Sequence, residues 1–226
     1  MRVRCEEREL LLAIPDLHGV VLDKHSLIEN AYKAAKRAGL SLLRLWVYIC
    51  FLKLGKRQAR SNLEESFEEV WPGTSHEKKD RFIRCFREEM IRNPCRLIEG
   101  SAETIYWLRR RNVEVVFCSG GERELLEYNL DFVGLDPRSF PLVTVEDGVK
   151  PDPRLLERVF QMVSVPPENS IYFGDTPSDL KLVRGWPTLF FPVLSGFTPR
   201  RVFLQNGVPE NRILNRFSDI RALIEY

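Results

Sequence analysis

Short apolar runs alternate with helical patterns through most of this chain, and this alternation restricts its fold more than any other feature. Each run is too short for a helix, is bounded by turn residues and is mostly rich in Val, Ile or Phe, as buried strands are. The runs are Leu10–Ile14, Val113–Cys118, Leu142–Val145, Ile171–Phe173 and Thr188–Val193. Because helical patterns separate them from about residue 97 onward, the sequence predicts an α/β fold with a parallel sheet covered on both faces.

The helical patterns fall into two groups. Those that follow residue 97 alternate with strands and are Ala102–Arg111, Glu122–Phe132, Pro153–Val163, Asp179–Arg184, Pro199–Asn206 and Ser218–Ile224. The others follow one another without a convincing strand and are Ser26–Ala38, Leu42–Leu54, Leu63–Val70 and Glu77–Arg92. The sequence therefore predicts an α/β core domain of residues 1–23 plus 97–226, interrupted by an all-helical domain of residues 24–96.

Composition excludes several classes of partner. The 34 Lys and Arg against 32 Asp and Glu give a formal charge of +2, too balanced to indicate a nucleic acid or a membrane. The apolar run Leu40–Leu54 is shorter than the roughly 20 residues of a membrane span, contains Arg44, and predicts a buried helix. The five cysteines form no C-x-x-C pair and the first residues lack the apolar stretch of a signal peptide, so we expect a cytoplasmic protein.

Charged and polar side chains follow four of the predicted strands. Asp16 comes after the first run, Ser119 with Gly120 after the second, Lys150 after the third, and Asp175 after the fourth. In an open α/β sheet, ligands bind in the crevice beyond the carboxyl ends of the strands. We therefore expect these groups to lie close together if the sheet forms.

This set of groups predicts chemistry on a phosphate. Asp16 and Asp175 offer the hard oxygen ligands that Mg²⁺ prefers, and Lys150 adds a positive charge. Ser119 and the amide of Gly120 can donate hydrogen bonds to phosphoryl oxygens. A carboxylate held against a metal ion and an ammonium is also an available nucleophile. Each acid alone could be an ordinary loop residue or helix cap, but their order at successive strand ends favours a site.

The same segments resemble the motifs of a known family. Asp16–Asp23, the strand ending at Ser119, Val149–Pro153 and Gly174–Asp179 are similar in order and spacing to the four motifs of the haloacid dehalogenase-like (HAD) hydrolases. The resemblance covers nearly the whole chain and is greatest to the phosphoglycolate-phosphatase-like branch, which has a helical cap after the first motif. It implies a Rossmann-like core and Mg²⁺-dependent hydrolysis of a small phosphomonoester.

The resemblance also implies a role for each residue that reacts with or binds the substrate. Asp16 would attack phosphorus and form an aspartyl-phosphate, and Lys150 would neutralise both the nucleophile and the phosphate. Ser119 and Gly120 would bind the phosphoryl group. The implied partner is a small phosphorylated metabolite, with no nucleic acid and no membrane, and the protein would be a monomer or a homodimer.

The metal site follows from the same resemblance. Mg²⁺ would be held by Asp16, Asp175 and the backbone carbonyl of His18. Asp179 would act from further out by orienting water bound to the metal.

His18 is where the sequence departs from the family pattern, because phosphatases of this superfamily usually carry a second Asp there as the general acid and base. An imidazole can move protons near neutral pH, so His18 is a candidate catalytic residue. The alternatives are a weakened protein that binds a phosphorylated metabolite or a protein partner, or a phosphotransferase, mutase or phosphonate hydrolase of the same superfamily. A dehalogenase is disfavoured because Gly174–Asp179 has the pattern of a cation site.

Overall fold

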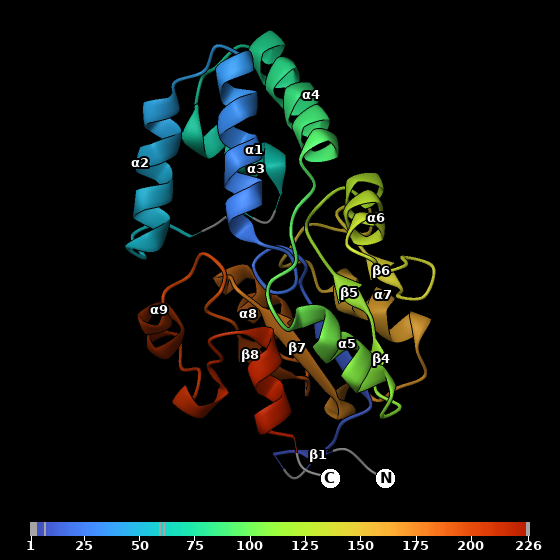
Figure 1. Cartoon of the computed structure of the whole chain (residues 1–226). Coiled ribbons are helices and arrows are strands. Elements are labelled where there is room, and N and C mark those ends of the chain that lie inside the picture. Colours follow the sequence, from blue (N-terminus) through green and yellow to red (C-terminus); the bar gives the residue numbers. More distant parts are fainter. Residues whose placement is uncertain (1–3, 7, 59, 61, 225–226) are drawn as a thin grey trace.

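A parallel four-stranded sheet lies at the centre of the α/β part of the molecule (Figure 1). The computed structural model describes residues 4–6, 8–58, 60 and 62–224. In spatial order the strands are β4 (Glu114–Val115), β3 (Leu12–Pro15), β7 (Ser170–Gly174) and β8 (Leu189–Pro192). The α/β class and the parallel sheet predicted from the sequence are confirmed.

A second parallel pair consists of β5 (Phe117–Cys118) and β6 (Leu142–Val143). In the chain, β5 comes one residue after the end of β4. The sequence predicted one continuous strand over Val113–Cys118, and this is wrong in detail. The amide of Val116 still donates to Ala13 of β3, whereas the amide of Phe117 donates to Pro141, next to β6. The strand is divided because the chain changes its pairing partner at this point.

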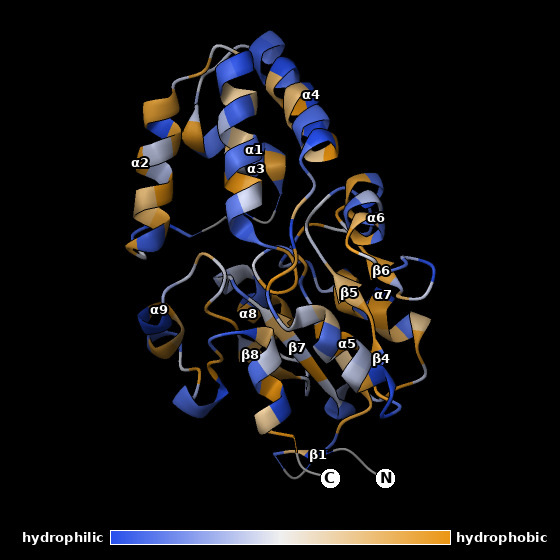
Figure 2. Cartoon of the chain, in the orientation of Figure 1, coloured by the Kyte–Doolittle hydropathy of each residue, from blue (hydrophilic) through white to orange (hydrophobic). Residues whose placement is uncertain are grey.

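Side chains of the strands alternate between two apolar cores, one on each face of the sheet. Leu12 and Ile14 belong to one core, and Ala13 between them belongs to the other. Tyr172 likewise faces away from Ile171 and Phe173. This alternation with a period of two is expected of a sheet buried on both sides. Hydrophobic colouring is continuous along β5 and β6 (Figure 2).

Helices of the α/β unit cover both faces of the sheet. They are α5 (Ser101–Arg109), α6 (Arg123–Phe132), α7 (Arg154–Met162), α8 (Pro177–Val183) and α9 (Arg200–Gln205), with 3₁₀ turns η1 (Pro167–Asn169), η2 (Glu210–Arg212) and η3 (Phe217–Ala222). The α-helix predicted over Ser218–Ile224 is thus a 3₁₀ helix. A hairpin of β1 (Arg4–Cys5) and β2 (Arg8–Glu9) was not predicted, because two-residue strands show no periodicity.

Four further helices gather at one end of the molecule, beyond the sheet (Figure 1). They are α1 (Lys24–Arg37), α2 (Leu42–Lys53), α3 (Leu63–Val70) and α4 (His76–Arg92), close to the predicted ranges. The carboxylate of Asp23 caps the start of α1 by accepting from the amides of His25 and Ser26, both at 3.1 Å. Asp23 therefore fixes the point where the chain leaves the sheet and enters these helices.

One face of α2 contacts solvent, although the sequence predicted a buried helix. Leu43 is 68% exposed and Trp46 is 56% exposed, while Leu45 and Ile49 on the opposite face are buried. The helix is exposed on one side because its main contacts, with α1 and α3, lie on the other side. Within the described part of the chain, no helix has both the length and the hydropathy that crossing a membrane would require.

Candidate active site

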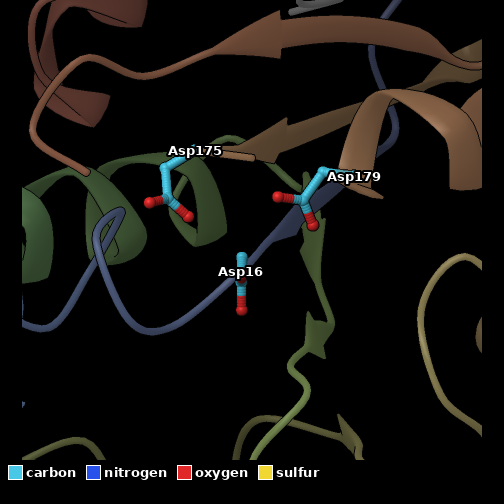
Figure 3. A group of neighbouring side chains, drawn as sticks. All are labelled: Asp16, Asp175 and Asp179. Atoms are coloured by element: carbon cyan, nitrogen blue, oxygen red, sulfur yellow. The ribbon is translucent and has the colours of Figure 1, made fainter. Parts of the chain in front are cut away.

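Three aspartates meet beyond the carboxyl ends of the central strands (Figure 3). Asp16 directly follows β3, Asp175 directly follows β7, and Asp179 lies in the first turn of α8. Their nearest carboxylate oxygens all lie within 4.8 Å of one another, and all three residues are buried. β3 and β7 are adjacent parallel strands in register, so their ends must lie side by side. Pro15 ends β3, where its missing N–H breaks no strand pairing.

Lys150 connects two of these carboxylates. Its ammonium lies 2.9 Å from Oδ2 of Asp16 and 2.8 Å from Oδ1 of Asp179, with the lysine side chain 2% exposed. Charged hydrogen bonds of this length in a water-poor setting fix the lysine firmly. The sequence prediction that Asp16, Lys150 and Asp175 converge at one rim of the sheet is confirmed in geometry.

Asp179 is held by bonds to the protein on both carboxylate oxygens. Oδ2 accepts from the amide of Thr176 at 2.9 Å and from its hydroxyl at 2.6 Å, which forms a capping box at the start of α8. Oδ1 accepts from Lys150 and, at 3.1 Å, from the hydroxyl of Tyr172. Asp179 does not line the cavity that contains Asp16. Its geometry therefore suits positioning Lys150 better than binding a ligand directly.

Asp175 lies in a cradle made by two glycines and one amide. The Phe197 amide donates to Oδ2 of Asp175 at 2.9 Å. Gly19 has a φ of +88°, and a Cβ there would lie 2.6 Å from the same oxygen. A Cβ on Gly196 would overlap the Asp175 carboxylate outright. The hydroxyl of Ser195 donates to the Gly19 carbonyl at 2.7 Å and holds the two segments together.

Replacing Gly196 with Ala is expected to displace the Asp175 carboxylate. The backbone of Gly196 has no positive φ, so the effect comes from overlap and not from backbone strain. We expect a loss of roughly 1–3 kcal/mol in the free energy of unfolding, the usual cost of overpacking a buried site, together with weakened Mg²⁺ binding. Urea denaturation and calorimetric Mg²⁺ titration measure the two effects, and wild-type values in both would show that the cradle does not constrain Asp175.

Burial dominates the electrostatics of the site. It raises the pKa of Asp16 to about 6, against the opposing effect of Lys150. Burial and then the charges of Asp179 and Asp16 raise the pKa of Asp175 well above its usual value. Burial alone would lower the pKa of Lys150, but the two neighbouring aspartates raise it above the ordinary value. The lysine is therefore charged at neutral pH.

The cluster has the charge and ligand chemistry of a magnesium site. Three buried carboxylates face one ammonium, and the raised pKa values of Asp16 and Asp175 reflect how costly their negative charge is in this setting without a further cation. Carboxylate oxygens are hard ligands, and no cysteine or histidine nitrogen takes part in this cluster of described residues. That donor set fits Mg²⁺, which prefers oxygen ligands and retains several waters.

The remaining predicted site residues line the same cavity. Ser119, Gly120 and His18 surround it together with Asp16 and Lys150. Ser119 directly follows β5, and its amide donates to the Val143 carbonyl of β6 at 2.9 Å. The structure therefore brings the predicted site residues together, and it adds contacts of Tyr172, Thr176 and Gly196 that the sequence did not predict.

His18 lies beside Asp16 with its ring half-buried. Burial, followed by the charge of Lys150, lowers the pKa of His18 to about 4, so the ring is neutral at physiological pH. Its Nε2 is buried and has no hydrogen-bond partner among the described residues. A buried ring nitrogen without a partner is an unmet hydrogen-bonding group that needs an explanation.

The chain is similar to several known proteins. The family model described as haloacid dehalogenase-like hydrolase matches residues 12–184. A phosphoglycolate phosphatase of Pseudomonas syringae pv. tomato is 29% identical over 150 residues, which cover 65% of this chain and 53% of that protein. The pyrophosphatase PpaX of Bacillus mycoides is 24% identical over 153 residues, covering 65% of this chain and 70% of that protein.

Solved structures show the same fold. A haloacid dehalogenase-like hydrolase from Bacteroides fragilis superposes with a TM-score of 0.77 at 19% identity, covering 94% of this chain and all of that one. The curated phosphoglycolate phosphatases are longer proteins, and the matching region of this chain spans about half of their length.

Proposed function

The chain belongs to the haloacid dehalogenase-like hydrolases, and on that premise we propose that it hydrolyses a phosphomonoester through an aspartyl-phosphate on Asp16. One observation carries the proposal. Asp16 opens onto a cavity whose wall also contains Lys150, Asp175, Ser119 and Gly120, although these residues are far apart in the sequence. Their convergence supplies a nucleophile, a cation, a metal ligand and phosphate-binding groups in one place.

Asp16 is prepared for attack by its two neighbours. Its Oδ1 accepts from the Leu17 amide at 2.7 Å, and its Oδ2 contacts Lys150 at 2.9 Å. A carboxylate oxygen of Asp16 forms a bond to phosphorus as the bond from phosphorus to the ester oxygen breaks, and that oxygen leaves as the alcohol after taking a proton from solvent water. Water then attacks phosphorus, the acyl-phosphate bond breaks, and phosphate leaves with Asp16 restored. Ser119 and the Gly120 amide would hold the phosphoryl oxygens, and Lys150 offsets their charge.

Asp16, Asp175 and the backbone carbonyl of His18 would hold Mg²⁺, which when bound withdraws electron density from the phosphoryl oxygens. Asp179 serves this arrangement indirectly, because it fixes Lys150 and the start of α8. These assignments follow from where each carboxylate faces: Asp16 and Asp175 line the cavity and Asp179 does not.

We further propose that residues 24–96 act as a cap domain over a core of residues 1–23 and 97–226. Helices α1 to α4 line the cavity from one side and the strand ends line it from the other. Closure of such a unit would exclude water while the aspartyl-phosphate forms.

His18 is the proposed proton acceptor for the attacking water. His18 lines the cavity, and its buried Nε2 has no hydrogen-bond partner among the described residues. Replacing His18 with Ala is expected to lower kcat by about 10²–10⁴-fold, the usual contribution of general acid–base catalysis. Phosphate binding by calorimetry should change little, because Lys150 and Ser119 remain. An unchanged kcat in His18→Ala would exclude this role.

A generic phosphatase assay tests the function as a whole. With p-nitrophenyl phosphate, we expect release that requires Mg²⁺, disappears on chelation with EDTA and returns on adding Mg²⁺. The alternative is a protein that binds a phosphorylated metabolite without turnover. It is favoured only by the presence of His18 where related phosphatases usually carry an Asp. No release by the wild type, with release gained in His18→Asp, would establish that alternative.

A further inference from the structure

The cavity that contains Asp16 and Lys150 continues deep among α1, α2, α3 and α4. Its volume is about 690 Å³, within the range of about 300–1,000 Å³ that encloses drug-sized ligands. A phosphoryl group needs only the polar end, beside the aspartates. Most of the cavity is therefore left for the organic part of a substrate.

The wall of this inner part is apolar. Leu45, Ile49 and Leu52 line it from α2, and each of these side chains is less than a tenth exposed. Phe67 of α3 and Phe82 of α4 line it from the other helices. Figure 2 shows hydrophobic residues along much of α2. Water beside such a wall has few hydrogen-bond partners, so an apolar group that displaces it gains free energy.

The cations of the cavity are already matched to carboxylates of the chain itself. Arg60 forms an ion pair with Glu69. Arg87 lies with Nε 2.7 Å and Nη2 3.0 Å from the two carboxylate oxygens of Glu122. Lys150 is bound to the active-site aspartates. No other Lys or Arg is found among the described residues that line the cavity.

Additional acidic residues line the cavity away from the aspartates. Glu64 and Glu65 of α3 lie at the exposed edge of the wall, where Glu64 is 3.5 Å from Lys79, and Glu146 lies on the other side. A substrate with a second anionic group, such as the carboxylate of phosphoglycolate, would find in the described wall only cations that already pair with carboxylates of the chain. The electrostatics of the cavity therefore disfavour a small anionic leaving group.

We propose that the substrate is a phosphomonoester whose organic group is bulky, uncharged and apolar, with its phosphate at Asp16 and its organic group among α2, α3 and α4. This inference rests on the proposed function for the chemistry, but the apolar part of the cavity selects its ligand whether or not turnover follows. The class includes long-chain alkyl and fused-ring alcohols esterified to phosphate.

The test is the affinity of n-alkylphosphonates. These compounds keep the charged head group but have a C–P bond in place of the ester linkage that a phosphatase hydrolyses. Calorimetry is performed on the whole protein with Mg²⁺, using methyl-, butyl- and octylphosphonate. Burial of each methylene should raise the affinity about three- to fourfold, so octylphosphonate should bind about 10²-fold more tightly than butylphosphonate. Equal affinities for these two would overturn the inference.

Turnover separates this inference from the proposed function. Octyl phosphate should be hydrolysed with a kcat/KM at least about 10²-fold above that of 2-phosphoglycolate, because the binding free energy of the longer alkyl chain also lowers the free energy of the transition state. A preference for 2-phosphoglycolate would overturn the inference while leaving the phosphatase intact. Affinity that rises with chain length, but with no hydrolysis of any ester, would support the ligand class and contradict the phosphatase.

A matched pair of variants on α2 localises the effect. Ile49→Asp places a charge in the apolar wall, whereas Leu43→Asp places it on the solvent face of the same helix. We expect Ile49→Asp to abolish the gain from butyl- to octylphosphonate, with methylphosphonate binding retained as evidence of a folded site, and Leu43→Asp to preserve it. Ile49→Thr serves the same purpose if the aspartate prevents folding, and an undiminished gain in a folded position-49 variant would contradict the placement.

Discussion

Replacing Asp16 with Asn is expected to abolish phosphate release, with kcat lowered by about 10⁴-fold or more, as when a residue of a catalytic unit is removed. The Asn side chain has nearly the same size as Asp, but its amide is uncharged and lacks the anionic oxygen that attacks phosphorus. Fixed-time release of phosphate from p-nitrophenyl phosphate measures the loss.

The fold should survive this change. Lys150 keeps its 2.8 Å contact with Asp179 when the charge of Asp16 is removed, so its ammonium still has one carboxylate partner. Asp80→Asn is a matched control, since Asp80 is exposed on α4 and does not line the cavity. Asp16→Asn with near wild-type turnover, in a preparation shown to carry the substitution, would remove Asp16 from the chemistry.

The Lys150→Met substitution is expected to destabilise the protein as well as inactivate it. Lys150 is the cation within contact distance of both Asp16 and Asp179, and its side chain is 2% exposed. Removing one partner of a buried ion pair typically costs about 3–5 kcal/mol because the remaining charges lose their compensation. Urea denaturation should show this loss in the free energy of unfolding.

Added Mg²⁺ should recover part of the lost stability of Lys150→Met, because it supplies positive charge to the same carboxylates. Lys181→Met is the control, because Lys181 is an exposed residue of α8 and its loss should cost little. If Lys150→Met unfolds within about 0.5 kcal/mol of the wild type, the range of ordinary surface changes, the cluster does not depend on this lysine.

The sequence predicted the secondary structure best where acidic and apolar residues recur at helical spacing. The range Leu63–Val70 is the same in prediction and structure, because alternating acidic and apolar residues at helical spacing define it. The division of the strand at Val116 and the hairpin of β1 and β2 could not be predicted, since both depend on which segments pair across the fold.

The candidate site was predictable at the level of which residues gather. Asp16, Lys150 and Asp175 each follow an apolar run, and parallel strands bring such positions to one edge. The environment of each was not predictable. Two examples are the occupation of both Asp179 oxygens by the protein and the approach of Gly196 to Asp175, which depend on side-chain geometry and on a loop that returns from β8.

The exposure of Trp46 shows why burial cannot be predicted from the sequence of a single helix. An apolar sequence such as α2 predicts burial on all sides, but burial requires a partner on each side, and the described structure packs only one face. The same helix nevertheless supplies the apolar wall of the cavity, so its two faces have different environments.

Reductive trapping of the intermediate tests the central claim most directly. The protein is mixed with p-nitrophenyl phosphate and Mg²⁺, quenched during turnover and treated with borohydride, which converts an aspartyl-phosphate to homoserine. Peptide mass spectrometry should find homoserine at position 16 and nowhere else, and should find none without substrate. Continued turnover with Asp16 unmodified, or homoserine at a different aspartate, would contradict the account.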